Sequence, residues 1–174
     1  MAYLEISNGQ DIMDSRDVIE RLDELQGARD DLDQAVEDLR EELDLAQEEL
    51  DLAEEEDLHD RADEMRAEVE RLNNEIGTAE AALRAWDEEN ESEFEPLKDF
   101  AKQGEDYASD WNHGATLIRD SHFEDYAQEL AEDIGAIDRN AAWPACHIDW
   151  AAAAESLKQD YTSIEFDGVT YWVR

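Results

Sequence analysis

Apolar residues recur at alternating steps of four and three from Val18 to Ala53, and this repeat constrains the fold more than any other feature of the sequence. Such spacing places all of them on one side of an α-helix and is typical of coiled coils, in which that stripe packs against a second helix. The series is Val18, Leu22, Leu25, Leu32, Val36, Leu39, Leu43, Ala46, Leu50 and Ala53, with the polar Arg29 at one position. A second series follows at Leu58, Ala62, Met65, Val69, Leu72, Ile76, Ala79, Leu83 and Trp86.

The two series are out of phase with each other. The step from Ala53 to Leu58 is five residues, which a repeat of threes and fours does not accommodate. The break falls in a polar segment where Asp57 or Asp60 could cap a new helix. We therefore favour an antiparallel helical hairpin, in which each arm buries its stripe on the other. One long helix with a discontinuity is the alternative, since no Gly or Pro marks a turn.

The sequence on either side of the repeats predicts other structure. Residues 2–6 are typical of a short strand, a Ser-Asn-Gly turn follows, and Asp14 or Ser15 is a plausible N-cap for the first helix. After Trp86 a polar stretch is expected to contain a short helix, with Pro96 in its first turn. We divide the chain into an N-terminal strand and turn (1–17), an acidic coiled-coil helical hairpin (18–90) and a small α+β domain (91–174).

Most of the aromatic residues lie after residue 106, which predicts a globular region there. Its expected elements are a helix that stops at Gly135 and a second helix capped by Asp149. In the last segment, β-forming residues flank Asp167 and Gly168, the strongest two-residue hairpin signal. The expected fold class is α+β, mostly α: an N-terminal acidic helical hairpin or coiled coil, followed by a small α+β domain with a C-terminal β-hairpin.

Acidic residues greatly outnumber basic ones, at 51 to 14, which gives a formal net charge of −37. Between Val18 and Asn90, 28 acidic and 7 basic residues leave 21 negative charges. A hairpin with arms about 50 Å long would then carry one net charge per ~2.4 Å of its axis, against about 1.7 Å for B-DNA. Such a field repels nucleic acid and anionic membranes and attracts basic surfaces. We therefore expect the partner to be a basic nucleic-acid-binding protein, with no direct binding to nucleic acid or membrane.

The densest acidic segment, EELDLAQEELDLAEEED, spans residues 41–57 and has ten acidic residues and no basic one. Within it, Leu45 and Leu52 lie seven residues apart and off the main stripe. They are either two scattered exposed leucines or a second contact surface, used by the C-terminal region or by a second subunit in a homodimer. The candidate DNA-mimic surface in this segment comprises Glu41, Glu42, Asp44, Glu48, Glu49, Asp51, Glu54, Glu55, Glu56 and Asp57.

The segment from Phe123 to the C-terminus contains three motifs: YAQELAEDIGAI, a helix with an acidic-Ile-Gly-Ala stop; HIDWAAAAESLKQDY, an Ile-Asp-aromatic start before a helix; and the closing ribbon IEFDGVTYWV. With these motifs the segment resembles the last domain of the ArdA-type antirestriction proteins. ArdA proteins are acidic, elongated dimers from mobile elements that imitate bent B-form DNA in the DNA groove of type I restriction-modification enzymes. This chain has acidic heptads where they have two upstream α/β domains. The resemblance implies a homodimer and an acidic helix face at Asp125, Glu129, Glu132 and Asp133.

No catalytic residue, cofactor or metal site is expected, and the chain is not predicted to be an enzyme. Its four histidines form no metal pair at helical spacing, and carboxylate pairs are too abundant to indicate acid–base chemistry. The start lacks a signal-peptide pattern and the single Cys146 fits a reducing compartment, so we expect the host-cell cytoplasm.

Together these features predict an anti-defence inhibitor, from a phage or mobile element, that mimics DNA charge. It would occupy the nucleic-acid-binding site of a host restriction, CRISPR or other defence complex. The alternative is a structural or adaptor coiled-coil protein whose acidity reflects solubility or adaptation to high salt.

Overall fold

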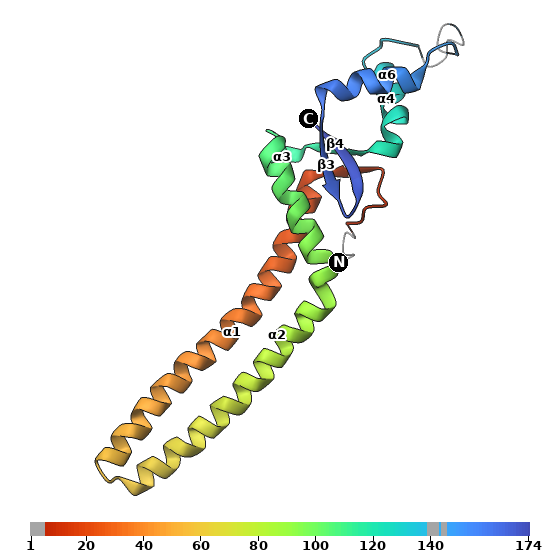
Figure 1. Cartoon of the computed structure of the whole chain (residues 1–174). Coiled ribbons are helices and arrows are strands. Elements are labelled where there is room, and N and C mark those ends of the chain that lie inside the picture. Colours follow the sequence, from red (N-terminus) through yellow and green to blue (C-terminus); the bar gives the residue numbers. More distant parts are fainter. Residues whose placement is uncertain (1–5, 139–142, 144–145) are drawn as a thin grey trace. The chain divides into compact units, whose positions relative to one another are not determined.

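The computed structural model describes residues 6–138, 143 and 146–174 (Figure 1). Its contacts define two compact units: a hairpin unit, residues 24–92, and a sheet unit, formed by the described residues up to 23 and from 93 onward. The fold class is the expected one, a long helical hairpin with a small α+β region that ends in a β-hairpin. In chain order the elements are β1 (Ile12–Asp14), α1 (Ser15–Glu55), α2 (His59–Tyr107), α3 (Trp111–Gly114), β2 (Thr116–Arg119), η1 (Asp120–His122), α4 (Phe123–Asp133), α6 (Trp150–Leu157), η2 (Lys158–Asp160), β3 (Thr162–Phe166) and β4 (Val169–Val173).

In the hairpin unit, α1 and α2 run antiparallel and bury the two apolar stripes between them (Figure 1). Stripe residues of this unit such as Leu32, Leu43 and Met65 are partly exposed, because two helices alone leave the edges of their seam open to water. The hairpin is confirmed, and the single long helix is wrong. The most buried stripe residues of the unit are Leu25, Val36, Ala46 and Ala53 on α1 and Ala62, Leu72 and Ile76 on α2.

The turn between the arms forms without Gly or Pro. Asp57 has a φ of 61°, in the left-handed region. The N–H groups of Leu58 and Asp57 donate to the carbonyls of Ala53 (2.9 Å) and Glu54 (3.2 Å). This is the Schellman motif, which satisfies the last carbonyls of a helix and usually has glycine at the left-handed position. Aspartate visits that conformation more readily than most residues, so a search for Gly or Pro misses this turn.

The predicted N-cap of α2 is wrong. Asp57 is the left-handed residue that follows the end of α1 at Glu55, and Asp60 lies inside the first turn of α2. The residue before α2 is Leu58, whose carbonyl accepts the N–H of Ala62 at 2.9 Å. Leucine has no side-chain acceptor, so this helix begins without the side-chain cap that the local sequence suggested.

A short helix beginning near Pro96 is also not found, because α2 runs through this region to Tyr107 with Pro96 in its interior. Proline there removes one helical hydrogen bond and crowds the preceding turn, at a cost of about 3 kcal/mol. Phe94, Leu97 and Phe100 are buried on the same stretch. Full burial of each such side chain contributes about 1.5–3 kcal/mol, so packing in the sheet unit overrides the local signal.

The sheet unit contains four antiparallel strands in the order β1-β2-β4-β3. The C-terminal hairpin pairs Ile164 with Tyr171, and Asp167 and Gly168 at its tip have φ values of 45° and 75°. These positive angles are those of the type I′ turn that Asp-Gly predicts. Strand β2, at residues 116–119, was not predicted. The strand expected at residues 2–6 lies, apart from Ile6, outside the described residues.

Helices cover both faces of this sheet. Tyr171 and Trp172 are neighbours on β4 and therefore point to opposite faces. On one face the ring of Phe100, from α2, lies 4.7 Å from that of Phe166 and 5.6 Å from that of Tyr171. On the other face Phe123, from α4, lies 6.0 Å from Trp172. The core on this second side also contains Ile118, Ala127 and Ala154.

Three helix ends near this sheet lie where the sequence predicted them. Asp14 precedes α1, and its Oδ1 accepts the N–H of Arg16 at 2.9 Å. Asp149 precedes α6, and its Oδ1 accepts the N–H of Ala152 at 3.1 Å. Gly135 follows α4 with a φ of 73°.

Candidate partner-binding surface

Six carboxylates form a continuous row along α1, on the side opposite its apolar stripe. Their steps of four and three residues place each beside the next on the helix surface. All six side chains are exposed. Within the part of the chain that the structure describes, none of the six makes an ion pair or side-chain hydrogen bond. The members of this acidic row are Glu37, Glu41, Asp44, Glu48, Asp51 and Glu55.

Within the described residues, no arginine of the hairpin unit pairs with a carboxylate of the acidic row. Four arginines join the two helices along the flanks of the seam, each to a carboxylate of the facing helix. These pairs connect the two antiparallel arms and direct the four arginines to carboxylates outside the acidic row. They are Arg29 with Asp87 (3.0 Å), Arg40 with Glu80 (2.7 Å), Arg61 with Glu49 (2.5 Å) and Arg66 with Glu54 (2.7 Å).

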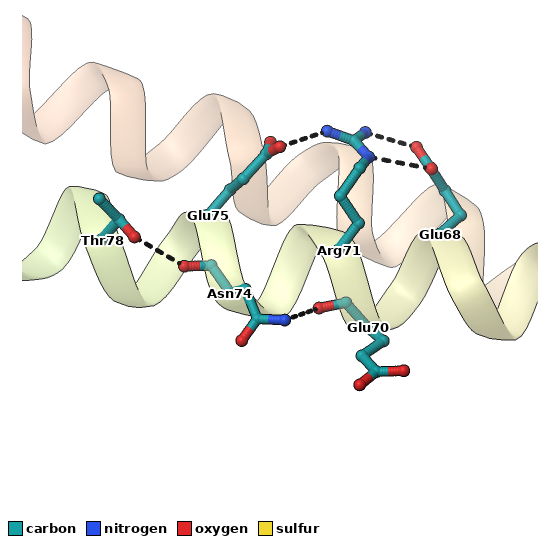
Figure 2. Close-up of polar contacts among 6 residues, drawn as sticks. All are labelled: Glu68, Glu70, Arg71, Asn74, Glu75 and Thr78. Atoms are coloured by element: carbon teal, nitrogen blue, oxygen red, sulfur yellow. Dashed lines mark hydrogen bonds and ion pairs between the residues drawn. The ribbon is translucent and has the colours of Figure 1, made fainter.

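A fifth arginine, Arg71, pairs within α2 itself (Figure 2). Its guanidinium binds Glu68 at 2.5 Å and Glu75 at 2.6 Å, on the preceding and following turns. The hydrogen bond from Arg71 lowers the pKa of the Glu68 carboxyl below its ordinary value. Arg71 therefore offsets the charge of carboxylates on α2 only. The outer surface of α2 contains such ion pairs, whereas the acidic row on α1 contains none.

The structure divides the predicted surface residues into four groups. Glu41, Asp44, Glu48, Asp51 and Glu55 belong to the acidic row. Glu49 and Glu54 lie on the flanks, where α2 arginines bind them, and Asp57 lies at the tip with its Oδ1 3.5 Å from the Nδ1 of His59. Glu42 and Glu56 are exposed and unpaired within the described residues. The density of acidic residues found most of the row but missed Glu37, which the steps of three and four identify.

The second predicted acidic face lies on α4, in the sheet unit. Asp125, Glu129 and Asp133 are exposed, whereas Glu132 is half-buried and accepts a hydrogen bond from Gln128 at 3.3 Å. The carboxylate of Asp125 lies 3.7 Å from the Nδ1 of His122. These charges are fewer than those of the acidic row and in part already have partners.

Leu45 and Leu52, the predicted dimer contact, project from α1 beside the acidic row. Their exposed fractions are 63% and 59%, so neither contributes to the core of the hairpin unit. The structure contains one chain, and the expected homodimer therefore stays a prediction.

A small titratable cluster lies in the sheet unit, around Lys158. Its Nζ binds Asp120 at 2.6 Å and Glu155 at 3.0 Å, and the Nε1 of Trp172 donates to the same Asp120 oxygen at 2.7 Å. The Nζ also lies over the rings of Phe123 and Trp172. The hydrogen bonds from Lys158 and Trp172 lower the pKa of the Asp120 carboxyl. Because the lysine is held by two carboxylates and two rings, this cluster stabilises the fold around η1 and α6.

In the described residues no group of three His, Cys, Asp or Glu side chains could hold a metal ion. Nor does any helix in that part of the chain combine the length and apolarity needed to cross a bilayer.

The fold and surface define an acidic helical-hairpin protein with a small α+β unit. No protein-family model, curated protein or solved structure matches the chain. The resemblance of its C-terminal segment to ArdA-type proteins accordingly stays a prediction.

Proposed function

We propose that this protein is an anti-defence inhibitor that presents DNA-like negative charge and occupies the nucleic-acid-binding site of a host defence enzyme. The observation that carries the proposal is the acidic row, six exposed carboxylates that pair with no basic side chain in the described part of the chain. The nearest arginine on the same helix, Arg40, pairs with Glu80 of α2 instead. A surface that only needed solubility would gain nothing from keeping its positive charges away from one side.

The charge density of the hairpin unit supports the proposal. Residues 24–92 contain 27 acidic and 6 basic residues, a net of 21 negative charges. The part of α1 in this unit has 32 residues and is therefore about 48 Å long. One net charge falls on every ~2.3 Å of axis, close to the value of about 1.7 Å for B-DNA.

The mechanism is occupation without chemistry. Counterions gather on a rod of this charge density and are released when a basic cleft replaces them, as happens when DNA binds. The released ions provide a free-energy gain that rises as salt falls. The inhibitor and DNA would then compete for one cleft, and both would be favoured at low ionic strength.

The test begins with capture of the partner from host lysate on three immobilised proteins. These are the wild type, the row variant Glu41→Gln/Glu48→Gln/Glu55→Gln, and the pair variant Glu49→Gln/Glu54→Gln/Glu80→Gln, which changes the net charge by the same amount. We expect a nucleic-acid-binding protein on the wild type and the pair variant and much less of it on the row variant. Equal loss on both variants would show that total charge, and not the row, determines binding.

The captured protein is then tested for competition with labelled duplex DNA. Inhibition by the wild type should weaken as the DNA concentration rises, because the two ligands share one site. Inhibition that stays constant as DNA rises would rule out occupation of the DNA site. The identity of the captured protein then shows whether the partner is a restriction enzyme, a CRISPR complex or another defence complex.

The alternative function is that of a structural or adaptor coiled coil, and the exposed Leu45 and Leu52 favour it, because an adaptor needs an apolar contact surface. In that case acidity serves solubility or high-salt adaptation, and the row variant keeps every partner. The row variant should then lose solubility or stability at high salt, whereas a mimic should lose its partner and keep its fold.

A further inference from the structure

The acidic part of α1 is a tandem repeat. Residues 41–47 read EELDLAQ and residues 48–54 read EELDLAE, so the two heptads differ only at Gln47 and Glu54. A repeat of seven residues presents the same surface twice, displaced by about 10.5 Å along the helix axis. Whatever one heptad can contact, the second can contact in the same way one step further along.

Each heptad has an apolar side chain on both sides of the helix. Ala46 and Ala53 are buried in the seam with α2, at 8% and 3% exposed. Leu45 and Leu52 occupy the same position as each other in the two heptads, but they point outward and remain exposed. The outward leucines are therefore a repeated feature of the sequence rather than two isolated surface residues.

The outward leucines and two glutamates outline a docking position for a helix. Leu45, Glu48, Glu49 and Leu52 stand at positions i, i+3, i+4 and i+7, the four corners of the hole that receives a side chain from a facing helix in coiled-coil packing. Two corners are apolar and two are acidic. A side chain that enters must be apolar, and its neighbours must be positive.

The surrounding charge selects a basic partner over a second copy of this chain. Every position three or four residues from either leucine is a glutamate: Glu41, Glu42, Glu48, Glu49, Glu55 and Glu56. Two copies meeting at this surface would bring these glutamates against each other, and like charges in contact are unfavourable. A helix with Lys or Arg beside its apolar residues would instead satisfy both leucines and carboxylates.

We propose that residues 41–56 of α1 form a docking site for a basic amphipathic helix, whose apolar residues pack on Leu45 and Leu52 while its Lys and Arg side chains meet the flanking glutamates. The proposal rests on the proposed function, since both place a basic partner on α1, but it adds a contact that nucleic acid does not make. A partner held in this way is recognised by shape as well as by charge.

The probes are two synthetic 21-residue peptides of identical composition, Leu, Ala, Lys and Arg. In the patterned peptide the leucines follow a heptad repeat, and in the permuted peptide the same leucines point to all sides. Dissociation constants are measured by fluorescence anisotropy with the full chain as wild type, as Leu45→Gln/Leu52→Gln and as the row variant. Gln is a good helix former, and circular dichroism confirms that each variant keeps its helix content.

The patterned peptide should bind the wild type about tenfold more tightly than the permuted peptide, which corresponds to partial burial of two leucines. Leu45→Gln/Leu52→Gln should remove this difference and leave the affinity of the permuted peptide unchanged. The row variant should weaken both peptides together, because it changes charge and not shape.

Equal affinity of the two peptides for the wild type would overturn this inference and leave the proposed function standing, because charge alone would then account for binding. Failure of both peptides to bind would count against the proposed function as well. Light scattering adds a separate outcome: a dimeric wild type that Leu45→Gln/Leu52→Gln converts to a monomer would assign the surface to a second copy of the chain and overturn the basic-helix proposal.

Discussion

Neutralising three of the six carboxylates of the acidic row, as in the row variant, should stabilise the hairpin unit at low salt. The row has five neighbouring contacts, and Glu41, Glu48 and Glu55 between them take part in all five. Three Gln substitutions therefore remove every like-charge contact of the row. Each such contact destabilises a helix by about 0.2–0.5 kcal/mol, so the row variant should gain roughly 1–2.5 kcal/mol in the free energy of unfolding.

The pair variant is the matched control for this measurement. Changing Glu49, Glu54 and Glu80 to Gln alters the net charge equally but removes attractive contacts with Arg61, Arg66 and Arg40. Exposed ion pairs contribute about 0.2–1 kcal/mol each. The pair variant should therefore be less stable than the wild type or equal to it, and never more stable.

Urea unfolding followed by circular dichroism, with hydrogen-exchange mass spectrometry on peptides from residues 24–92, reports on the hairpin unit. The measurements are made at ~0.01 M and ~1 M salt, where the screening length falls from about 30 Å to about 3 Å. The gain of the row variant should disappear at high salt. Equal gains for both variants would show that only total charge matters, and a gain that persists at high salt would rule out repulsion as its cause.

Four further predictions concern the backbone and the sheet unit. Gly104→Ala should destabilise the sheet unit by about 1–3 kcal/mol in urea unfolding followed by tryptophan fluorescence, because a Cβ there would lie 2.2 Å from the buried ring of Trp111. Gly77→Ala, which has open space around it, should stabilise the hairpin unit by about 0.5–1 kcal/mol in hydrogen exchange; a loss of protection would contradict this. Asp57→Gly should raise the midpoint of thermal unfolding, because glycine adopts the left-handed turn without the cost that aspartate has. Asp120→Asn should be less stable than the wild type above its ordinary pKa of 3.8, and the difference in urea midpoints should shrink as the pH falls through the lowered folded pKa; a difference independent of pH would refute this.

The sequence predicted those elements whose signals are local. The phase break at Ala53, the Asp-Gly pair and the cap at Asp149 each depend on a few neighbouring residues, and all three features appear in the structure. Strand β2 could not be predicted in this way. Its four residues are a strand because they pair with β1 and β4, which are far away in sequence. The helix start predicted at Pro96 was wrong for the same reason, because packing against residues far away in sequence keeps α2 helical around this proline.

The candidate surface could also be predicted only in part from the sequence. A count of acidic residues locates the segment but does not distinguish Glu48, in the acidic row, from Glu49, which Arg61 binds at 2.5 Å. That distinction needs the position of α2, because neighbouring residues on a helix point in different directions. Spacing along α1 would have added Glu37, since it lies four residues before Glu41.

The tandem heptads also bear on how this chain can change in length over evolution. Duplication or loss of one seven-residue unit in α1, matched by one heptad of α2, preserves the phase of both apolar stripes and the turn at Asp57. The hairpin unit would then lengthen or shorten by about 10.5 Å per heptad, and the remaining contacts between its helices would stay the same. A duplication also copies one leucine and its glutamates. Related chains should therefore differ by multiples of seven residues in each arm, and the length of the charged surface would change with them.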